Sequence, residues 1–327
     1  MAKVFITRPL PEPGASLLSG AGHEVVVSQH DRPLSRDALL AGIADADAVL
    51  CLLSDRMDAV AMDAAPRLRV IANYAVGYDN IDVAAATERG IVVTNTPDVL
   101  TEATADIAWT LLLATARQAI VGDRLVRSGS WTGWAPRQLL GPSTTGKTLG
   151  ILGMGRIGAA IGRRARGFSM RVIYHNRRRN PEAEAELGAE YVSLQELLER
   201  SDFLSLNSPL TPETRHLIDE AALHRMKPGA IIVNTGRGPL IDEGALVRAL
   251  RERRIAGAGL DVFEREPQLE PGLAELDNVV ILPHLGSATF EARAEMVRLC
   301  SENILAVLAG RPALTPLNPQ AAGKRGG

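Results

Sequence analysis

Short apolar runs recur through the first third of the chain and alternate with stretches whose apolar positions have helical spacing. These runs are Val4–Thr7, Glu24–Val27, Ala48–Leu53, Leu68–Ile71 and Ile91–Val93. Helical patterns, such as Arg36–Ile43 and Val83–Arg89, lie between several of them. Mostly apolar strands that alternate with helices are typical of parallel sheets covered by helices on both faces. The pattern therefore predicts a doubly wound α/β domain.

The same alternation restarts near Gly150 and predicts a second parallel sheet. Its apolar runs are Leu149–Leu152, Arg171–Tyr174, Phe203–Leu206, Ala230–Asn234, Ala256–Leu260 and Val279–Leu282. Between the two sets we expect one long helix from Thr101 to Val126, because Pro97 ends the preceding strand. A last amphipathic helix is expected over about Phe290–Ala309. The small, polar and basic tail, Asn318–Gly327, is expected to be disordered.

Composition narrows the class of protein. The 327 residues are enough for two domains. With 46% hydrophobic residues and a net charge of −2, the chain lacks the basic field that attracts nucleic acid or an anionic membrane. No apolar run reaches the ~18 residues of a membrane span, and the chain begins directly with a strand, so we expect a cytoplasmic protein with a small-molecule partner.

The cysteines and histidines give no indication of a metal site. Cys51 and Cys300 lie far apart in separate apolar runs and are expected to be buried thiols. The six histidines do not have the spacing of metal ligands. We therefore expect no metal.

A glycine-rich turn follows the first strand of the second set, with the sequence Gly153-Met154-Gly155-Arg156-Ile157-Gly158. The first glycine permits a tight turn, the second lets the backbone approach a phosphate, and the third lets the helix pack on the strand. The helix that follows presents unpaired N–H groups and the positive end of its dipole. This context predicts that the six residues bind a dinucleotide, with a plain strand-to-helix turn as the alternative.

The end of the next strand indicates which dinucleotide is bound. NAD-binding domains usually place an acid about 20 residues after the glycine turn, on the adenosine ribose. This chain has Asn176-Arg177-Arg178 instead. An acid would repel a 2′-phosphate, whereas arginines bind it through charge-assisted hydrogen bonds. We therefore expect a preference for NADP(H), with NAD(H) as a possible substitute. Arg177 and Arg178 are the expected contacts, and Arg179 is expected to face solvent. The alternative is that the whole stretch is an exposed basic turn.

Two residues suit the reduction of a 2-oxo acid. Such a reaction brings hydride to the carbonyl carbon and a proton to its oxygen, so the protein must hold a carboxylate and supply an acid. Arg237 lies in a Gly-Arg-Gly turn after a strand and offers a rigid fork to the carboxylate and the carbonyl oxygen. His284 follows an apolar strand, and the carboxyl ends of strands are where doubly wound sheets bind ligands. A surface arginine and a core histidine are the alternatives.

Five motifs resemble those of the D-isomer-specific 2-hydroxyacid dehydrogenases. They are Asn73–Asp82, Gly153–Gly158, Val233–Gly238, Gly259–Pro267 and Pro283–Thr289. The resemblance covers nearly the whole chain, and Ser130–Trp134, the arginine turn and His284–Thr289 are most similar to glyoxylate/hydroxypyruvate reductases. It implies two Rossmann-like domains. The substrate domain is discontinuous, residues 1–98 and 288–327, and the cofactor domain is 99–287, whereas composition alone suggests a single cut near residue 100.

The resemblance also implies roles for individual residues. Glu266, rather than the competing Glu264, is expected to hydrogen-bond His284 and keep it protonated near neutral pH. Asp261 is expected to contact the nicotinamide side or to support Arg237. The other residues expected at the cofactor are Thr104, Ser208, Pro209, Thr214, Thr235, Gly236 and Gly286. Those expected at the substrate are Leu53, Val76, Gly77 and Trp134.

Within the substrate set, Trp134 is a special case. In similar reductases a tryptophan at this place reaches the active site of the partner subunit, so the resemblance implies a homodimer formed through the cofactor domains. Core packing or anchoring of its loop is the alternative for this side chain. The activity implied is reduction of glyoxylate and hydroxypyruvate with NADPH. A phosphoglycerate dehydrogenase or a reductase of larger 2-oxo acids is the nearest alternative, and a nucleotide-sensing transcriptional corepressor is a more distant one.

Overall fold

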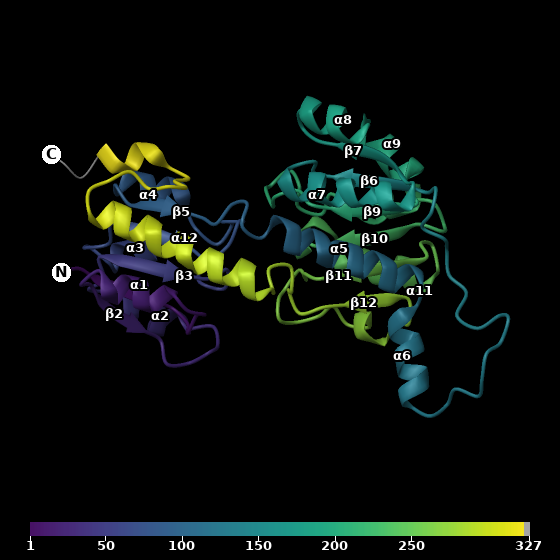
Figure 1. The fold of residues 1–327 in the computed structure, drawn as a ribbon, viewed down its shortest axis with the longest axis horizontal. Helices are drawn as coiled ribbons and strands as arrows, with labels where there is room; N and C mark the ends of the chain where they lie inside the picture. The colour runs from purple at the N-terminus through teal and green to yellow at the C-terminus, as the bar shows by residue number, and fades with distance from the viewer. Residues whose placement is uncertain (324–327) are drawn as a thin grey trace. The chain divides into compact units, whose positions relative to one another are not determined.

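The computed structural model describes residues 1–323, and in it the chain divides into two compact units. Unit 1 contains Met1–Leu100 and the segment that begins at Ala288, and unit 2 contains Thr101–Ser287. Each unit has its own parallel sheet and its own core, which confirms the predicted class of two doubly wound α/β domains (Figure 1). In the part of the chain that is described, no helix combines the length and the apolar character needed to cross a membrane.

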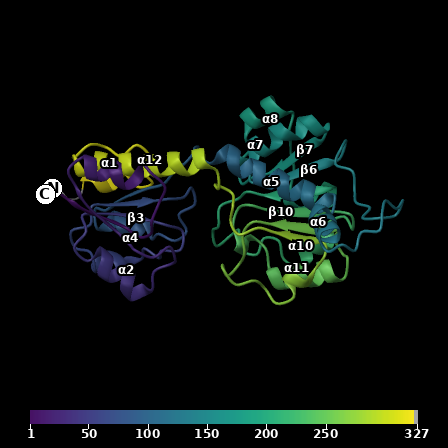
Figure 2. The same cartoon turned by 60° about the horizontal axis from the view of Figure 1, so that its bottom comes forward.

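Unit 1 is a five-stranded parallel sheet in the order β2-β1-β3-β4-β5. The strands are β1 (Lys3–Ile6), β2 (Glu24–Val27), β3 (Ala48–Cys51), β4 (Val70–Asn73) and β5 (Val92–Thr94). The helices are α1 (Gly14–Gly20), α2 (Arg36–Ile43), α3 (Ala59–Asp63), α4 (Val83–Glu88) and α12 (Phe290–Leu308), with the 3₁₀ helix η4 (Pro319–Gly323). One core cluster joins α1 and α12 to one face of the sheet, and another joins α2, α3 and α4 to the opposite face (Figure 2).

Unit 2 is a seven-stranded parallel sheet in the order β12-β11-β10-β9-β6-β7-β8. The strands are β6 (Thr148–Leu152), β7 (Arg171–His175), β8 (Glu190–Tyr191), β9 (Phe203–Leu206), β10 (Ile231–Asn234), β11 (Gly257–Leu260) and β12 (Val279–Ile281). The helices are α5 (Thr101–Ala116), α6 (Ala119–Arg127), α7 (Arg156–Ala165), α8 (Pro181–Leu187), α9 (Leu194–Arg200), α10 (Glu220–Arg225) and α11 (Glu243–Arg251), with the 3₁₀ helices η1 (Arg166–Phe168), η2 (Gly238–Leu240) and η3 (Leu273–Glu275).

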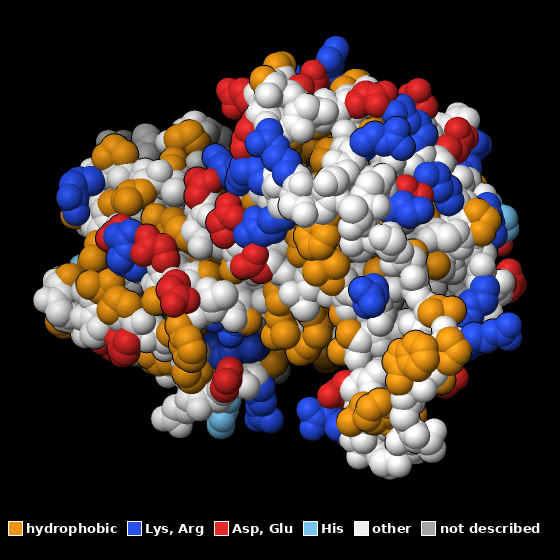
Figure 3. Space-filling model, turned by 45° about the vertical axis from the view of Figure 1, so that its right-hand side comes forward, with side chains coloured by type: hydrophobic (Ala, Val, Ile, Leu, Met, Phe, Trp, Pro, Cys, Tyr) orange, Lys and Arg blue, Asp and Glu red, His pale blue; other side chains and the backbone are white. Residues whose placement is uncertain are grey.

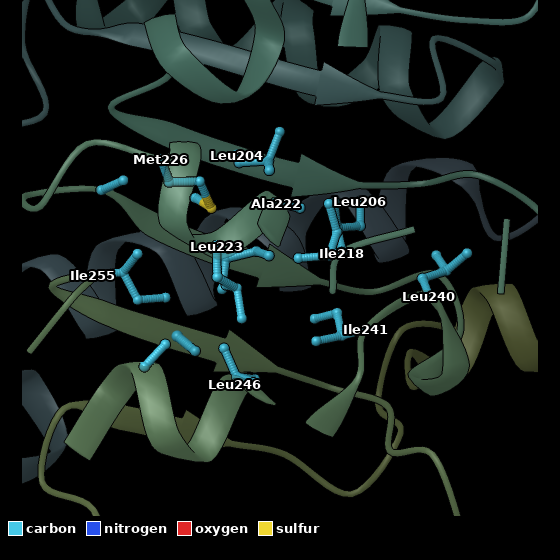
Figure 4. Packing of buried hydrophobic residues seen from close by; sticks show 14 of the residues in the cluster. Leu204, Leu206, Ile218, Ala222, Leu223, Met226, Leu240, Ile241, Leu246 and Ile255 are labelled. Carbon is cyan, nitrogen blue, oxygen red and sulfur yellow. The ribbon is translucent and has the colours of Figure 1, made fainter. Parts of the chain in front are cut away.

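Two apolar clusters hold the helices of unit 2 against its sheet. One contains side chains of α5, α7 and α8, and the other contains side chains of α9, α10 and α11. Figure 4 shows part of the second cluster, which contains Leu223 of α10, Leu246 of α11 and Leu204 and Leu206 of β9. Burial of apolar side chains on both faces keeps the strand ends, and the loops that follow them, in fixed positions.

The predicted long helix from Thr101 to Val126 is wrong, because the structure divides it into α5 and α6. Gln118 has the left-handed φ of 50° and interrupts the helical path. Its side-chain amide donates to the Leu140 carbonyl at 2.8 Å. A Cβ on Gly141 would lie 1.9 Å from the Ala116 carbonyl oxygen. The returning loop therefore packs directly on the end of α5 and sets the break.

The tail is not disordered over its first residues. Asn318 is fully buried. Its side-chain oxygen accepts from the Val93 N–H at 2.8 Å, and its amide donates to Thr87 and to the Ile91 carbonyl, at 2.9 Å each. These hydrogen bonds hold residue 318 against β5 and α4, and the composition of the tail gave no indication of them. The rest of the predicted disordered tail, 324–327, lies outside the described residues.

Candidate active site

The glycine turn lies between β6 and α7. At β6 the order in which successive strands are added to the sheet of unit 2 reverses. Gly153 has a φ of 98°, and a Cβ there would lie 2.6 Å from the Ser208 nitrogen in the loop after β9. A Cβ on Gly158 would lie 2.3 Å from the Gly153 carbonyl oxygen. A Cβ on Gly155 would have nothing within 4 Å. Two glycines are thus required by the protein's own packing, and the third leaves open space at the start of α7.

Two buried polar atoms after the neighbouring strands β9 and β10 have no hydrogen-bond partner within residues 1–323. They are the Asn207 side-chain oxygen and the Thr235 hydroxyl. Buried polar groups are normally satisfied, so such atoms indicate a missing ligand. Together with the open space at Gly155 and the uncapped N-terminus of α7, they fit a dinucleotide that lies across β6 and β9, at the topological switch point of the sheet.

Asn176 contacts the glycine turn directly. Its side-chain oxygen accepts from the Met154 N–H at 2.6 Å, and its amide, like that of Asn180, donates to the Met154 carbonyl. The Met154 side chain is buried in the core of unit 2. Asn176 and Met154 therefore fix the shape of the glycine turn through contacts within the protein. The predicted contact of these two residues with a cofactor stays a prediction. The sequence gave no indication of this second role for Asn176.

The three arginines after β7 differ in their surroundings. Arg179 forms an ion pair with Glu184 at 2.6 Å and lies over the Tyr191 ring. Arg177 and Arg178 are exposed and form no salt bridge within residues 1–323, although the charge of Arg177 contributes to lowering the pKa of the Glu213 carboxyl. Arg179 is exposed, as predicted, and its charge is in addition paired with Glu184. Arg177 and Arg178 are available to an external anion.

The loop after β9 is held by its own hydrogen bonds. The Thr214 hydroxyl donates to the Pro209 carbonyl and accepts from the Thr211 N–H, at 2.8 Å each. Ser208 approaches Gly153, as described above. Across the neighbouring strand, Gly236 has only 3.2 Å between its Cβ position and the Leu206 carbonyl oxygen. Ser208, Pro209, Thr214 and Gly236 thus line one edge of the same switch point.

His284 and Glu266 form a hydrogen-bonded pair, with 3.0 Å between His284 Nδ1 and Glu266 Oε2. Glu266 Oε1 accepts from the Phe263 N–H at 3.0 Å. Burial acts to raise the pKa of the Glu266 carboxyl, but the hydrogen bond and charge of His284, together with the Phe263 N–H and the charge of Arg237, outweigh burial, so this pKa lies below its ordinary value. Glu266 therefore stays ionised beside the imidazole. Glu264 pairs elsewhere, with Arg215 and His216.

Asp261 supports the turn that carries His284. It is 1% exposed, and its two oxygens accept from the N–H groups of Leu285 and Gly286, at 2.7 and 2.8 Å. Burial raises the pKa of this carboxyl above its ordinary value. The Thr104 hydroxyl donates to the Gly286 carbonyl at 3.0 Å. Asp261 and Thr104 thus hold the 284–286 turn in place, which agrees with the structural alternative for these residues, and their expected cofactor contacts stay predictions.

Arg237 follows β10, and its turn is fixed by the buried Asn234. The Asn234 side chain donates to the Arg237 carbonyl at 2.9 Å and accepts from the Gly236 N–H at 3.0 Å. Because β10, β11 and β12 are parallel neighbours, Arg237, Asp261 and His284 emerge at the same edge of the sheet. Asn234 was missed as a site residue, since a strand-terminal Asn is too common to be noticed.

In unit 1, the predicted substrate residues follow β3 and β4. The carbonyls of Val76 and Gly77 accept from the side-chain amides of Asn95 and Asn73, at 2.8 Å each. The N–H groups of Val76 and Gly77 have no backbone partner within residues 1–323. A turn whose carbonyls are tied back while its N–H groups stay free is suited to binding an anion. Leu53 lies in the turn after β3.

Trp134 is 82% exposed, so the alternative of core packing is wrong for this side chain. It lies in the segment that joins α6 to β6, which extends away from the sheet of unit 2 (Figure 1). α6 has no buried residue. Large apolar side chains are exposed on α6 and this segment, and Figure 3 shows hydrophobic groups gathered on the projecting part: Ile120, Val126, Trp131, Trp134 and Leu140.

The fold, together with the side chains of Arg237, Glu266 and His284, defines a nicotinamide-dependent dehydrogenase. Comparison with known proteins gives its family. Residues 109–286 match the model described as D-isomer specific 2-hydroxyacid dehydrogenase, NAD binding domain. The chain is also 54% identical over 322 residues to a glyoxylate reductase of Thermococcus kodakarensis, covering 97% of this chain and 96% of that protein. The protein therefore belongs to the D-isomer specific 2-hydroxyacid dehydrogenase family.

Solved structures of similar proteins agree with this assignment. A glyoxylate reductase from Paecilomyes thermophila is 40% identical with a TM-score of 0.88, covering 98% of this chain and 99% of that one. An NADPH-dependent glyoxylate/hydroxypyruvate reductase from Sinorhizobium meliloti, in complex with NADP and malonate, is 36% identical with a TM-score of 0.85, covering 98% of each chain.

Proposed function

We propose that the protein is an NADPH-preferring reductase of small 2-oxo acids, with glyoxylate first and hydroxypyruvate second. The observation that carries the proposal is the His284–Glu266 pair at the same sheet edge as Arg237. The similarity to glyoxylate reductases over nearly the whole chain supports the choice of substrate. Phosphoglycerate and larger 2-oxo acids are the alternatives that a substrate panel distinguishes.

The proposed mechanism assigns one task to each of the three side chains. The Arg237 guanidinium binds the substrate carboxylate and the carbonyl oxygen, which fixes the face of the carbonyl and polarises it. His284 donates a proton from Nε2 to that oxygen, since Nδ1 faces Glu266. Glu266 stabilises the imidazolium before the transfer. The bound nicotinamide cofactor supplies the hydride, and the Val76–Gly77 turn is proposed to contribute amide donors to the carboxylate.

For the cofactor, we propose that Arg177 and Arg178 bind the 2′-phosphate of NADP(H). Both are exposed, and the described chain holds neither in a salt bridge, although the charge of Arg177 acts on Glu213, whereas Arg179 is paired with Glu184. Hydrogen bonds to charged groups contribute roughly 1.5–3 kcal/mol each, but exposed pairs often contribute under about 1 kcal/mol. We therefore expect a preference for NADPH between about tenfold and a few hundredfold.

Steady-state kinetics tests this function. The values of kcat/KM are measured for glyoxylate, hydroxypyruvate, 3-phosphohydroxypyruvate and a bulky 2-oxo acid, with NADPH and with NADH. We expect glyoxylate with NADPH to give the largest value. The paired substitution Asn176→Asp with Arg177→Ala should reverse the cofactor order, and Arg179→Ala is its control, because Arg179 already pairs with Glu184. Equal or better use of NADH by the unaltered enzyme would exclude phosphate recognition by these arginines.

We also propose that two copies associate through α6 and the segment after it. An exposed group of large apolar side chains on a projecting element is typical of an interaction surface. Self-association would cover this surface and would place Trp134 near the partner subunit. The proposal rests on the exposure of these side chains and on the family resemblance.

A further inference from the structure

A buried carboxyl group lies below the loop that carries Glu266. Glu243 is the first residue of α11 and is 2% exposed. Its Oε1 accepts from the Glu264 backbone N–H at 2.7 Å, while its Oε2 has no hydrogen-bond partner within residues 1–323. Acidic side chains are rarely buried this completely without a pairing cation. Its place at the start of α11 does not by itself explain why the Glu243 carboxyl group is buried so completely.

The residue that Glu243 holds is fixed from its other end as well. The Glu264 carboxylate receives Arg215 Nη2 at 2.9 Å and lies 2.7 Å from His216 Nε2. Backbone and side chain of Glu264 are thus anchored to α11 and to the 215–216 turn. Only Arg265 separates this anchored residue from Glu266.

The same stretch of backbone supports the turn of Arg237. A Cβ on Gly238 would lie 1.9 Å from the Phe263 carbonyl carbon and 2.4 Å from the Glu264 nitrogen. The Phe263 N–H in turn donates to Glu266 Oε1. A shift of the 263–264 backbone would therefore displace both Glu266 and the Arg237 turn.

We propose that Glu243 is a positioning residue: by accepting the Glu264 N–H, it holds the 263–266 loop in the place where Glu266 pairs with His284. The inference rests on the proposed function, because it assigns Glu243 an effect on proton transfer. Glu243 contacts neither His284 nor Arg237 in any hydrogen bond of the described chain, so its effect passes through the backbone of the loop.

The chemistry of the position favours an acceptor over a fixed charge. Burial, and to a lesser degree the nearby Glu264 and Glu270, raise the pKa of the Glu243 carboxyl, against the Glu264 N–H and Arg265. Glutamine offers the same acceptor oxygen without a titratable group. It should therefore substitute for Glu243, whereas an apolar side chain of similar size should not.

The test compares Glu243→Leu with Glu243→Gln in the full-length protein. Glu243→Leu should lower kcat with glyoxylate by about 10- to 100-fold, the scale of a small misplacement of catalytic groups, with KM for NADPH within about twofold. The alkaline limb of its kcat/KM profile should move to lower pH, because the imidazolium loses its aligned carboxylate. Glu243→Gln should keep kcat within about twofold and keep the pH profile.

A matched control separates positioning from stability. Asp242 caps the same helix by accepting from the Ala245 N–H at 2.9 Å, and Asp242→Ala should lower Tm while leaving kcat and the pH profile unchanged. If Glu243→Leu lowered only Tm, as Asp242→Ala does, the positioning role would be excluded. Should Glu243→Leu not fold, Glu243→Asp, which withdraws the acceptor by one methylene, decides in the same way. Absence of turnover in the unaltered enzyme would instead overturn the proposed function.

Discussion

His284 has a backbone conformation that side chains rarely adopt, with a φ of 56°. Left-handed conformations of residues other than glycine cost on the order of 1–3 kcal/mol and persist where the surroundings enforce them. Here the His284 N–H donates to the Asp261 carbonyl at 2.9 Å, and the Asp261 carboxylate holds the next two N–H groups. The buried aspartate thus fixes the direction of the imidazole, and Glu266 fixes its rotation.

The first prediction at this scale concerns the proton donor. His284→Ala should lower kcat for glyoxylate by the ~10²–10⁴ expected of a lost general acid, with little change in the Kd for NADPH. Stopped-flow turnover and a fluorescence titration of the cofactor measure the two quantities. His224→Ala is the control, because that histidine is exposed and its side chain hydrogen-bonds the Glu220 carbonyl within α10. Unchanged kcat in His284→Ala would exclude the role.

The second prediction concerns Glu266, whose pKa lies below its ordinary value through the contact with His284. The carboxylate is thus ionised across the neutral range and favours the imidazolium. In Glu266→Gln the imidazolium loses this charge, so the alkaline limb of kcat/KM for glyoxylate should move to lower pH. Below neutral pH, the Glu266→Gln variant should keep a larger share of the activity of the unaltered enzyme than it keeps above neutral pH. A profile from pH 5 to 10 that overlays the unaltered enzyme would contradict the pairing.

At the scale of elements, the glycine turn between β6 and α7 separates requirements of folding from requirements of binding. Gly153 and Gly158 are excluded from carrying a side chain by backbone atoms 2.3–2.6 Å from their Cβ positions. Gly155 has an ordinary negative φ and open space around its Cβ position. The three glycines look equivalent in the sequence. The structure shows that packing requires Gly153 and Gly158, whereas only a bound ligand would require Gly155.

The third prediction uses this difference. Gly158→Ala should reduce the free energy of unfolding by about 1–3 kcal/mol, because the added methyl overlaps the Gly153 carbonyl. Gly155→Ala should leave stability nearly unchanged and raise the Kd for NADPH at least tenfold, because the methyl occupies the space proposed for the phosphates. Thermal unfolding and cofactor titration are measured on both variants. Equal Kd values for Gly155→Ala and the unaltered protein would contradict the placement of the cofactor.

At the scale of the whole molecule, α6 and residues 128–140 contribute no buried side chain to unit 2. A nine-residue helix without a buried side chain gains little from tertiary packing, which normally supplies most helix stability. Its apolar residues remain exposed, with Val126 at 58% and Trp134 at 82%. Association of two copies would supply the missing burial.

The fourth prediction tests this association. Sedimentation equilibrium should show a dimer, and Val126→Asp should convert it to a monomer, because a charge would be buried at the interface. Val60→Asp is the control, since Val60 is 61% exposed on α3 of unit 1.

Trp134→Ala should keep glyoxylate reduction and improve turnover of bulkier 2-oxo acids. A monomeric unaltered protein, or no gain with bulky substrates, would contradict the respective parts.

The sequence by itself determined the class of fold and the family. The period of its apolar runs follows from the geometry of strands and helices, and the glycine turn and the Glu-Pro and Pro-His motifs are local patterns that can be read without a structure. The positions of β6, β9 and β10 were predictable for this reason. So was the separation of Glu266 from Glu264 as the partner of His284, although only through resemblance.

The tertiary structure decided what depends on strand order and on contacts between distant residues. Asn318 bonds Val93 across 225 positions, Thr104 bonds Gly286 across 182, and Glu243 bonds Glu264 across 21. The break at Gln118 likewise depends on a loop that returns to α5. Propensity and periodicity describe neighbours along the chain, whereas these partners are brought together only by the packing of the sheet and its helices.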